Sequence, residues 1–277
     1  MRFIICACML VLLASACTAS ATYVNIIEPY NATVGNNGSV YLGKVGPGQT
    51  FFVTVSASTT NSSGSMMDLG WNKLVVTGIP QGWLAQNSSL YNPTLSAKIT
   101  VAPNASNGTY VFNLTAINVG NYSGLGHVSF KAYANVTPDV FVLDVHPTSI
   151  STGPGEPASI YVQINNTGVS DSPFVISAQD LPGVNSTQTV IALHSTTQQF
   201  VYGVYENEPG VYNMKLRVSS LASPRVYKET DIALRVAASL PNDYEALGQG
   251  VLAFPIIYEP AYAVMYLISI VARALHA

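Results

Sequence analysis

Charged residues are scarce in this chain, where Asp, Glu, Lys and Arg make up 9% of 277 residues. Soluble domains usually carry about 25% charged residues, so something other than charge has to keep the surface hydrated. The formal net charge of −3 provides no basic surface of the kind that binds nucleic acid. Intrinsic disorder is excluded as well, because 48% of the residues are hydrophobic and disordered chains are poor in such residues.

Cysteine is missing from most of the chain. The three cysteines that occur are Cys6, Cys8 and Cys17. Around them the sequence has the features of a secretory signal, namely Arg2, an apolar run over 3–13 and small residues suited to cleavage within 14–21. We assign residues 1–21 to a helical signal peptide rather than to a buried N-terminal helix. Cys17 is also a candidate for lipidation, as the first residue of a mature chain.

Recognisable catalytic and metal-binding motifs are missing too. A chain cleaved after residue 21 has no cysteine for a disulfide, a nucleophile or a metal site. The histidines, which lack metal-site spacing, are His127, His146, His194 and His276. Glu206 and Glu208 flank one turn and are expected on a solvated loop, while Asp68 and Asp171 lack the Asp-x-Asp-x-Asp pattern of a calcium loop. We expect a protein that is not an enzyme and has no cofactor and no metal site.

Asparagine provides the strongest positive signal. Of 20 asparagines, 11 begin an Asn-x-Ser/Thr sequon, whereas the 48 Ser and Thr residues would give about 3–4 by chance. N-glycosylation would hydrate a surface without charge; the alternative is an Asn/Ser/Thr-rich composition that forms sequons by accident. The candidate acceptors are Asn31, Asn37, Asn61, Asn87, Asn104, Asn107, Asn113, Asn121, Asn135, Asn165 and Asn185.

The chain also divides into two copies of one pattern. Nine sequons precede residue 140 and two follow it, whereas seven charged residues lie within 22–139 and thirteen within 140–238. Three motifs recur at offsets of 102–107 residues, which indicates a duplicated domain. The recurring pairs are Gly46-Pro47-Gly48 with Gly153-Pro154-Gly155, Gly78-Ile79-Pro80 with Asp180-Leu181-Pro182, and Tyr110 with Tyr212. We assign one domain to 22–139 and a second to 140–238.

Both copies show the period-two alternation of strands packed on one face. In the second copy Ile160, Val162 and Ile164 alternate with polar residues, and Leu216 follows Lys215. Turn signals recur every 8–15 residues, and we find no convincing helix between the signal segment and residue 238. The pattern predicts an all-β chain of two tandem Ig-like antiparallel β-sandwiches, preceded by the signal helix and followed by an apolar helical tail.

The turns carry a family resemblance. A glycine-proline-glycine turn opens each copy, the second copy contains Ile164-Asn165-Asn166-Thr167-Gly168, and the first contains Ile79-Pro80-Gln81-Gly82-Trp83. Over roughly 215 residues these motifs resemble the alpha-galactosidase-associated Ig-like domains and the related cell-adhesion-type (CARDB-like) domains of prokaryotic, especially archaeal, envelope proteins. The first copy lacks the asparagine-threonine-glycine turn. The resemblance implies an extracellular scaffold or binding module without catalytic residues.

The tail, residues 239–277, differs from the two domains. It is almost wholly apolar over 251–272, which as one helix would span about 33 Å, enough for a bilayer core. Arg273 would then mark the inner side of the membrane. Glu259 and Pro260 oppose a full span, so a helix packed on a domain or on a partner protein is the alternative. We expect membrane association through 251–272.

Two functions fit these observations. The first is a cell-envelope surface glycoprotein, extracellular and anchored to the membrane, that acts as a scaffold or adhesion module and contacts other envelope proteins. The second is a secreted or anchored accessory module that binds carbohydrate or protein, with Trp71 and Trp83 on its binding surface. Aromatic side chains can stack on sugars but at strand spacing belong more often to a core. Buried tryptophans would favour the scaffold, and exposed ones the binding module.

Overall fold

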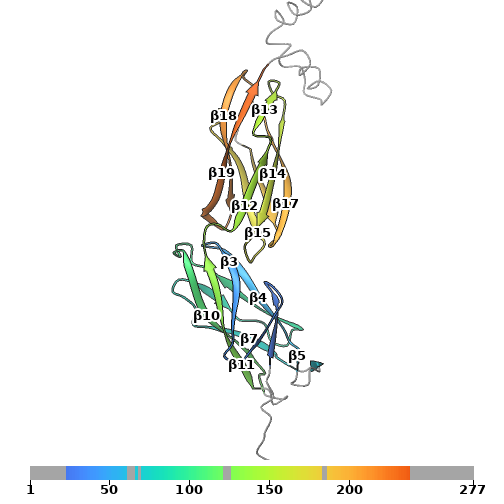
Figure 1. Ribbon diagram of the computed structural model, residues 1–277, viewed down its shortest axis with the longest axis vertical. Coiled ribbons are helices and arrows are strands. Elements are labelled where there is room, and N and C mark those ends of the chain that lie inside the picture. Colours follow the sequence, from blue (N-terminus) through green and yellow to red (C-terminus); the bar gives the residue numbers. More distant parts are fainter. Residues whose placement is uncertain (1–22, 61–65, 68–69, 121–125, 183–185, 238–277) are drawn as a thin grey trace, which may run out of the picture. The chain divides into compact units, whose positions relative to one another are not determined.

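The computed structural model describes residues 23–60, 66–67, 70–120, 126–182 and 186–237, and every regular element in these ranges is a strand (Figure 1). The prediction of an all-β chain is therefore confirmed, while the signal peptide and the apolar tail lie outside the described residues. The chain divides into two compact units. Unit 1 contains the described residues up to Gly43, Thr50–Ala102 and Gly108–Asn135; unit 2 contains Lys44–Gln49, Pro103–Asn107 and the described residues from Val136 onward.

Unit 1 is a sandwich of two sheets, with strand orders β2-β1-β4-β9-β8 and β3-β11-β10-β7, and β5 and β6 form a separate short hairpin. Aromatic side chains from both sheets meet in its core, where the rings of Phe51 on β4 and Phe112 on β10 lie 6.5 Å apart. The strands are β1 Tyr23–Glu28, β2 Ala32–Gly35, β3 Ser39–Val45, β4 Thr50–Ser56, β5 Thr59–Thr60, β6 Met66–Met67, β7 Lys73–Thr77, β8 Leu84–Gln86, β9 Thr94–Thr100, β10 Gly108–Ile117 and β11 His127–Val136.

Unit 2 is a sandwich of a three-stranded sheet, β12-β14-β17, and a five-stranded sheet, β13-β19-β18-β15-β16. The rings of Phe141 on β12 and Phe174 on β15 lie 4.7 Å apart and join the two sheets. The strands are β12 Phe141–His146, β13 Ser149–Thr152, β14 Ala158–Asn166, β15 Ser172–Gln179, β16 Thr187–Ala192, β17 Thr196–Val204, β18 Gly210–Ser220 and β19 Ser223–Val236.

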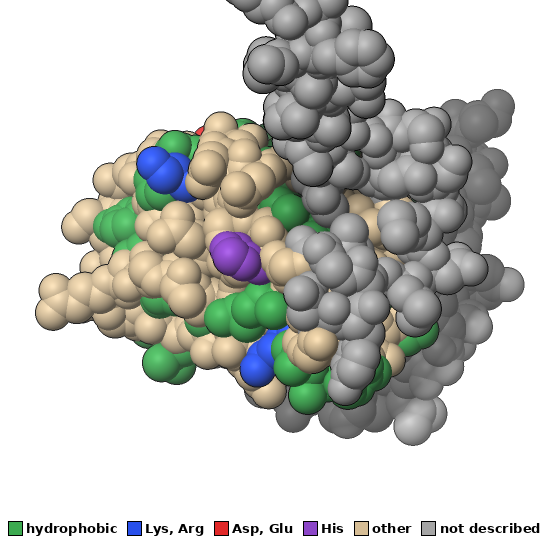
Figure 2. All heavy atoms as spheres, turned by 90° about the horizontal axis from the view of Figure 1, so that it is seen from below, with side chains coloured by type: hydrophobic (Ala, Val, Ile, Leu, Met, Phe, Trp, Pro, Cys, Tyr) green, Lys and Arg blue, Asp and Glu red, His purple; other side chains and the backbone are tan. Residues whose placement is uncertain are grey.

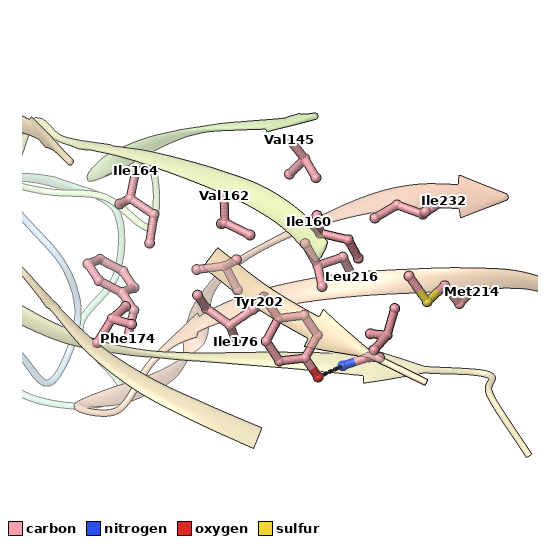
Figure 3. Close-up of a cluster of buried hydrophobic side chains, with 14 of the residues drawn as sticks. Val145, Ile160, Val162, Ile164, Phe174, Ile176, Tyr202, Met214, Leu216 and Ile232 are labelled. Atoms are coloured by element: carbon pink, nitrogen blue, oxygen red, sulfur yellow. Dashed lines mark hydrogen bonds between the residues drawn. The ribbon is translucent and has the colours of Figure 1, made fainter. Parts of the chain in front are cut away.

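The core of unit 2 lies between these sheets (Figure 3). Ile160, Val162 and Ile164 on β14 are fully buried, as is Leu216 on β18, while Lys215 beside it is exposed. The predicted inside and outside positions are therefore confirmed for these strands. The period of two follows from the pleat, which turns successive side chains to opposite faces of a sheet.

The strand order identifies both units as Ig-like. In the constant-type Ig sandwich the first, second, fifth and fourth strands form one sheet, and the third, sixth and seventh form the other. Unit 1 reproduces this order with β1-β4-β9-β8 and β7-β10-β11, and adds β2 and β3. Unit 2 has β12-β14-β17 and β15-β18-β19 in the same places. The expectation of purely antiparallel sheets is wrong for β13, which pairs with β19 in parallel because the chain crosses between sheets after β12.

The recurring motifs lie at corresponding places in the two units. The two glycine-proline-glycine turns precede β4 and β14, the two proline-containing turns follow β7 and β15, and the two tyrosines lie on β10 and β18. One of the seven shared strands differs in its pairing. The fourth strand joins β9 in unit 1, as β8, but joins β15 in unit 2, as β16. The duplicated segment therefore extends a different sheet in each unit.

Candidate glycan-bearing surface

The eight sequon asparagines within the described residues all reach solvent. The exposed ones are Asn31, Asn37, Asn87, Asn104, Asn107 and Asn113, and the half-buried ones are Asn135 and Asn165. The remaining candidates, Asn61, Asn121 and Asn185, lie outside the described residues. N-linked glycans need acceptors at the surface, and all eight described acceptors meet this condition.

Two asparagines in the described ranges are buried, and neither begins a sequon. Asn118 is 8% exposed, and its Nδ2 donates to the carbonyl oxygen of Gly70 at 2.9 Å. Asn166 is 1% exposed and joins two loops through its amide. These two asparagines act as internal hydrogen-bonding groups, and no described sequon asparagine is buried with them.

Two acceptors, Asn113 and Asn135, lie on the four-stranded sheet of unit 1. Asn113 on β10 is opposite Thr77 on β7, and it alternates with the buried Phe112 and Leu114. Gly78, with φ +65°, comes next to it, and a Cβ at that position would lie 3.2 Å from Nδ2 of Asn113. Glycine at this turn therefore keeps space free at the nitrogen to which an N-linked glycan is attached.

Other acceptors are held by turns. Asn37, between β2 and β3, has φ 60°, a left-handed conformation that asparagine tolerates better than most residues. Asn87 follows β8, and its Oδ1 accepts a hydrogen bond from the backbone nitrogen of Val76 at 2.8 Å. This bond orients the side chain and does not involve Nδ2. On the face in Figure 2, uncharged side chains and backbone cover most of the described area.

The two tryptophans do not form a binding surface. Trp71 is 2% and Trp83 is 5% exposed. The ring of Trp83 packs against Tyr110 and Phe112, with ring centres 5.3 Å and 6.2 Å apart. The suggestion that these residues line a site for sugar or protein is therefore wrong, because their rings fill the core of unit 1, where water and ligands are excluded.

Glu206 is also placed differently from the expectation of a solvated loop. It is 4% exposed, and its Oε1 accepts from the backbone nitrogens of Asn207 at 2.8 Å and Glu208 at 3.4 Å. Charge-assisted bonds of this kind stabilise a carboxylate away from water. The side chain organises the turn before β18, and Glu208 itself is exposed, as expected.

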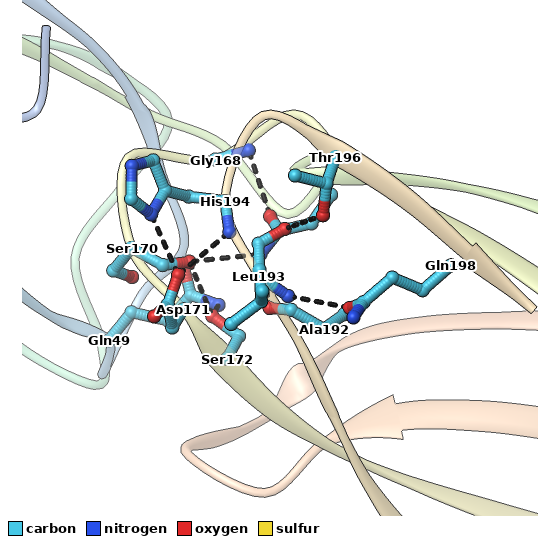
Figure 4. Close-up of polar contacts among 11 residues, drawn as sticks. Gln49, Gly168, Ser170, Asp171, Ser172, Ala192, Leu193, His194, Thr196 and Gln198 are labelled. Atoms are coloured by element: carbon cyan, nitrogen blue, oxygen red, sulfur yellow. Dashed lines mark hydrogen bonds and ion pairs between the residues drawn. The ribbon is translucent and has the colours of Figure 1, made fainter.

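A network of polar side chains joins two loops at one end of unit 2 (Figure 4). Nδ2 of Asn166 donates to the carbonyl oxygens of Ser170 and Ala192, both at 2.9 Å, and its Oδ1 accepts from the nitrogen of Gly168 at 3.0 Å. One side chain therefore fixes the β14–β15 loop and ties it to the end of β16. The asparagine-threonine-glycine motif has a structural role here, as a turn built around a buried amide.

Asp171 makes a second link between the same loops. Its Oδ1 accepts from the backbone nitrogen of His194 at 2.8 Å and lies 2.7 Å from Nδ1 of the same residue. Burial raises the pKa of Asp171, but the backbone and side-chain hydrogen bonds from His194 outweigh it, so the pKa lies below its usual value. Among the described residues, Asp, Glu, His and Cys form no group of three or more that could hold a metal ion.

Replacing Asp171 with Asn should reduce the stability of unit 2 in a pH-dependent way. Because the folded pKa of Asp171 is lowered, its contribution is present above the unfolded value of about 3.9 and is lost as the pH falls through the folded value. The melting temperatures of wild type and D171N should differ at pH 5–6 and converge below about pH 3.9. A difference that persists unchanged at low pH would contradict this. Asp144→Asn, in a more exposed pair with His146, is the control and should have a smaller effect.

The remaining candidates lie outside the described residues. They are Cys17, the lipidation candidate, and 251–272, the expected membrane segment. Within the part of the chain that the structure describes, there is no helix of the length and hydrophobicity needed to cross a bilayer.

Comparison with known proteins adds little to the strand order. No family model matches the chain, and no curated protein matches it. A cycloisomaltooligosaccharide glucanotransferase from Paenibacillus sp. matches with TM-score 0.27 and 17% identity over 34% of this chain and 14% of its own. The PapD-like domain 7 of human CEP192 matches with TM-score 0.27 and 15% identity over 37% of this chain and 88% of its own. Titin domains z1z2, crystallised with telethonin, match with TM-score 0.24 and 14% identity over 78% of this chain and 98% of their own. The Ig-like assignment rests on the strand order of each unit.

Proposed function

We propose that this protein is a surface glycoprotein of the cell envelope, in which two Ig-like units act as a non-enzymatic extracellular scaffold or adhesion module. The observation that carries the proposal is the excess of sequons, 11 among 20 asparagines, together with the exposure of the described ones. Described sequon asparagines all reach solvent, while the buried Asn118 and Asn166 lie outside sequons. Glycans at the sequons would hydrate a surface that charged residues cover only sparsely.

The finer parts of the proposal come from the sequence. The sandwiches would be CARDB-like domains of an archaeal type of envelope protein, exported by the signal peptide of residues 1–21. Residues 251–272, or a lipid on Cys17, would hold the chain at the membrane. The nine sequons before residue 140 would then cover the copy farther from a C-terminal anchor, where shielding by glycans is needed most.

The alternative, a module that binds carbohydrate or protein, loses support because its proposed aromatic surface is absent. Trp71 and Trp83 are buried, and buried tryptophans favour the scaffold over the binding module. An adhesion module needs no preformed cleft, since protein–protein contacts of standard size use flat surfaces of about 800 Å² per partner.

The mass of the native chain tests this proposal. We expect the chain to be recovered with the membrane fraction, to start near residue 22 and to exceed its polypeptide mass by several glycans. Asn113→Gln should lower that mass by one glycan, because Asn113 is exposed on β10. Asn213→Gln, at an exposed position of β18 outside any sequon, is the matched control and should leave the glycan mass unchanged. A native mass equal to that of the bare polypeptide would show that the sequons are accidental.

A further inference from the structure

In unit 2, β17 leaves one long backbone edge open among the described residues. Among the described residues β17 pairs with β14 alone, and it stands at the edge of its sheet. The carbonyl oxygen of Gly203 accepts from Oγ of Ser186 at 3.4 Å, on the side away from β14. In an antiparallel strand the N–H and C=O of one residue point to the same edge, and successive residues alternate. The backbone groups of Thr197, Gln199 and Val201 therefore point to the open edge.

Unit 1 covers the corresponding edge. There β8 pairs with β9, the counterpart of β17, so the sheet continues. Because β8 joins that sheet, β7 is left at the edge of the other sheet of unit 1. The segment that follows β8 closes this edge with its side chains and backbone. Oδ1 of Asn87 accepts from the nitrogen of Val76, and Oγ of Ser88 accepts from that of Leu74, both at 2.8 Å. The described part of unit 2 has no comparable cover along 197–201.

The open edge also lacks the usual protection against pairing. Proteins guard exposed edges with charged side chains, prolines or short strands. With nine residues, β17 is the longest described edge strand, and it contains neither charge nor proline. No Asp, Glu, Lys or Arg occurs within 181–205, although thirteen occur within 140–238. At the opposite edge of the same sheet, β12 carries the paired Asp144 and His146.

We propose that β17 pairs antiparallel with β17 of a second copy of this chain about a twofold axis. Only one register pairs all three outward-pointing residues with one another, and it sets Gln199 opposite Gln199 of the second copy and Thr197 opposite its Val201. A strand that pairs with itself sets like side chains against each other, so any charge near the axis would be repelled. The absence of charge over 181–205 fits a second copy, whereas selection of a foreign strand by charge would require charged residues here.

Pairing in this register joins two three-stranded sheets into one continuous six-stranded sheet. Three residues on each strand supply the backbone hydrogen bonds, and the Gln199 amides meet at the axis. This is strand addition of the kind that proteins use for peptide recognition, with the same strand as donor and acceptor. The inference rests on the described strands of unit 2 and does not depend on the membrane anchor.

A cysteine at position 199 tests the axis. Directly opposed residues in a hydrogen-bonded antiparallel pair have Cα atoms about 5.5 Å apart, which is within the range of a disulfide. Under mild oxidation the full-length Gln199→Cys chain should form a dimer on a non-reducing gel, with a peptide linked to itself through residue 199. Gln163→Cys is the control, because Gln163 is exposed beside Gln199 on β14 but away from the edge. It should give only background dimer.

Three further variants test the register and the backbone. Chains with Thr197→Cys or Val201→Cys alone should give background dimer, but their mixture should cross-link. Val201→Pro removes an N–H that points outward and leaves the pairing with β14 intact, so it should weaken dimerisation at least tenfold in sedimentation experiments without changing the circular dichroism. A Gln199→Cys chain that dimerises no more than the Gln163→Cys control overturns the proposal. So does a wild-type chain that sediments as a monomer at every concentration, or a position-199 cross-link to another protein in native material.

Discussion

Replacing Leu216 with Asp should destabilise unit 2 by at least about 3 kcal/mol, the largest effect that we expect from a single substitution. Leu216 is fully buried on β18, in the core that Ile160 and Ile176 also line (Figure 3). A carboxylate at this position loses its hydration and meets apolar side chains. For a domain of about 100 residues, this loss corresponds to a fall in melting temperature of roughly 12–24 °C.

Denaturant unfolding of the full chain measures this effect in the transition of unit 2. The neighbouring Lys215 is exposed and provides the control. It lies opposite Asp231 on β19, so Lys215→Asp would set two carboxylates against each other, and Lys215→Gln is the cleaner substitution. Changes at exposed positions usually stay within about 0.5 kcal/mol. A larger loss for Lys215→Gln than for Leu216→Asp would mean that β18 presents the opposite face to the core.

Replacing Asn166 with Ala should cost about 2–4 kcal/mol, because three hydrogen bonds are lost together. The substitution leaves the nitrogen of Gly168 and the carbonyl oxygens of Ser170 and Ala192 without the partner they have in the folded chain. An unpaired buried group carries the full penalty of its desolvation. The loop between β14 and β15 should therefore open more readily, which hydrogen exchange at Gly168 would detect.

The adjacent Asn165 provides an unusually close control. Asn165→Gln removes a sequon and changes a half-buried side chain, whereas Asn166→Ala keeps the sequon as Asn165-Ala-Thr167. We expect Asn165→Gln to change the glycan mass but not the stability of unglycosylated protein, and Asn166→Ala to do the reverse. If Asn166→Ala leaves the unfolding transition in place, the buried amide does not hold the two loops together.

Much of the fold follows from patterns that the sequence displays openly. The alternation on β14 and β18 predicts which side chains are buried, because a strand packed on one face requires it. The same alternation, continued from Ile160 through Ile164, assigns Asn166 to the core side, so the signal for the buried amide is a polar residue at an apolar position. The exposure of Asn113 follows in the same way from its place between Phe112 and Leu114.

Other features have no local signal. Trp71 and Trp83 lie in connections just outside the alternating strands, so the pleat does not predict which way they point. Glu206 occurs beside a turn with ordinary polar composition, and only the surrounding backbone makes it a buried acceptor. The sheet that the fourth strand joins is equally undetermined, since alternation specifies a buried face but not the neighbour along the sheet edge.

That choice of neighbour also affects how such domains diverge after duplication. A single short segment can extend only one of the two sheets, so the strand that it leaves behind becomes an edge: β7 in unit 1 and β17 in unit 2. Substitutions confined to this segment would move the open edge from one side of the sandwich to the other while the core residues outside the segment stay the same. Self-association through an open strand would therefore depend on the placement of this one segment more than on the residues that line the core.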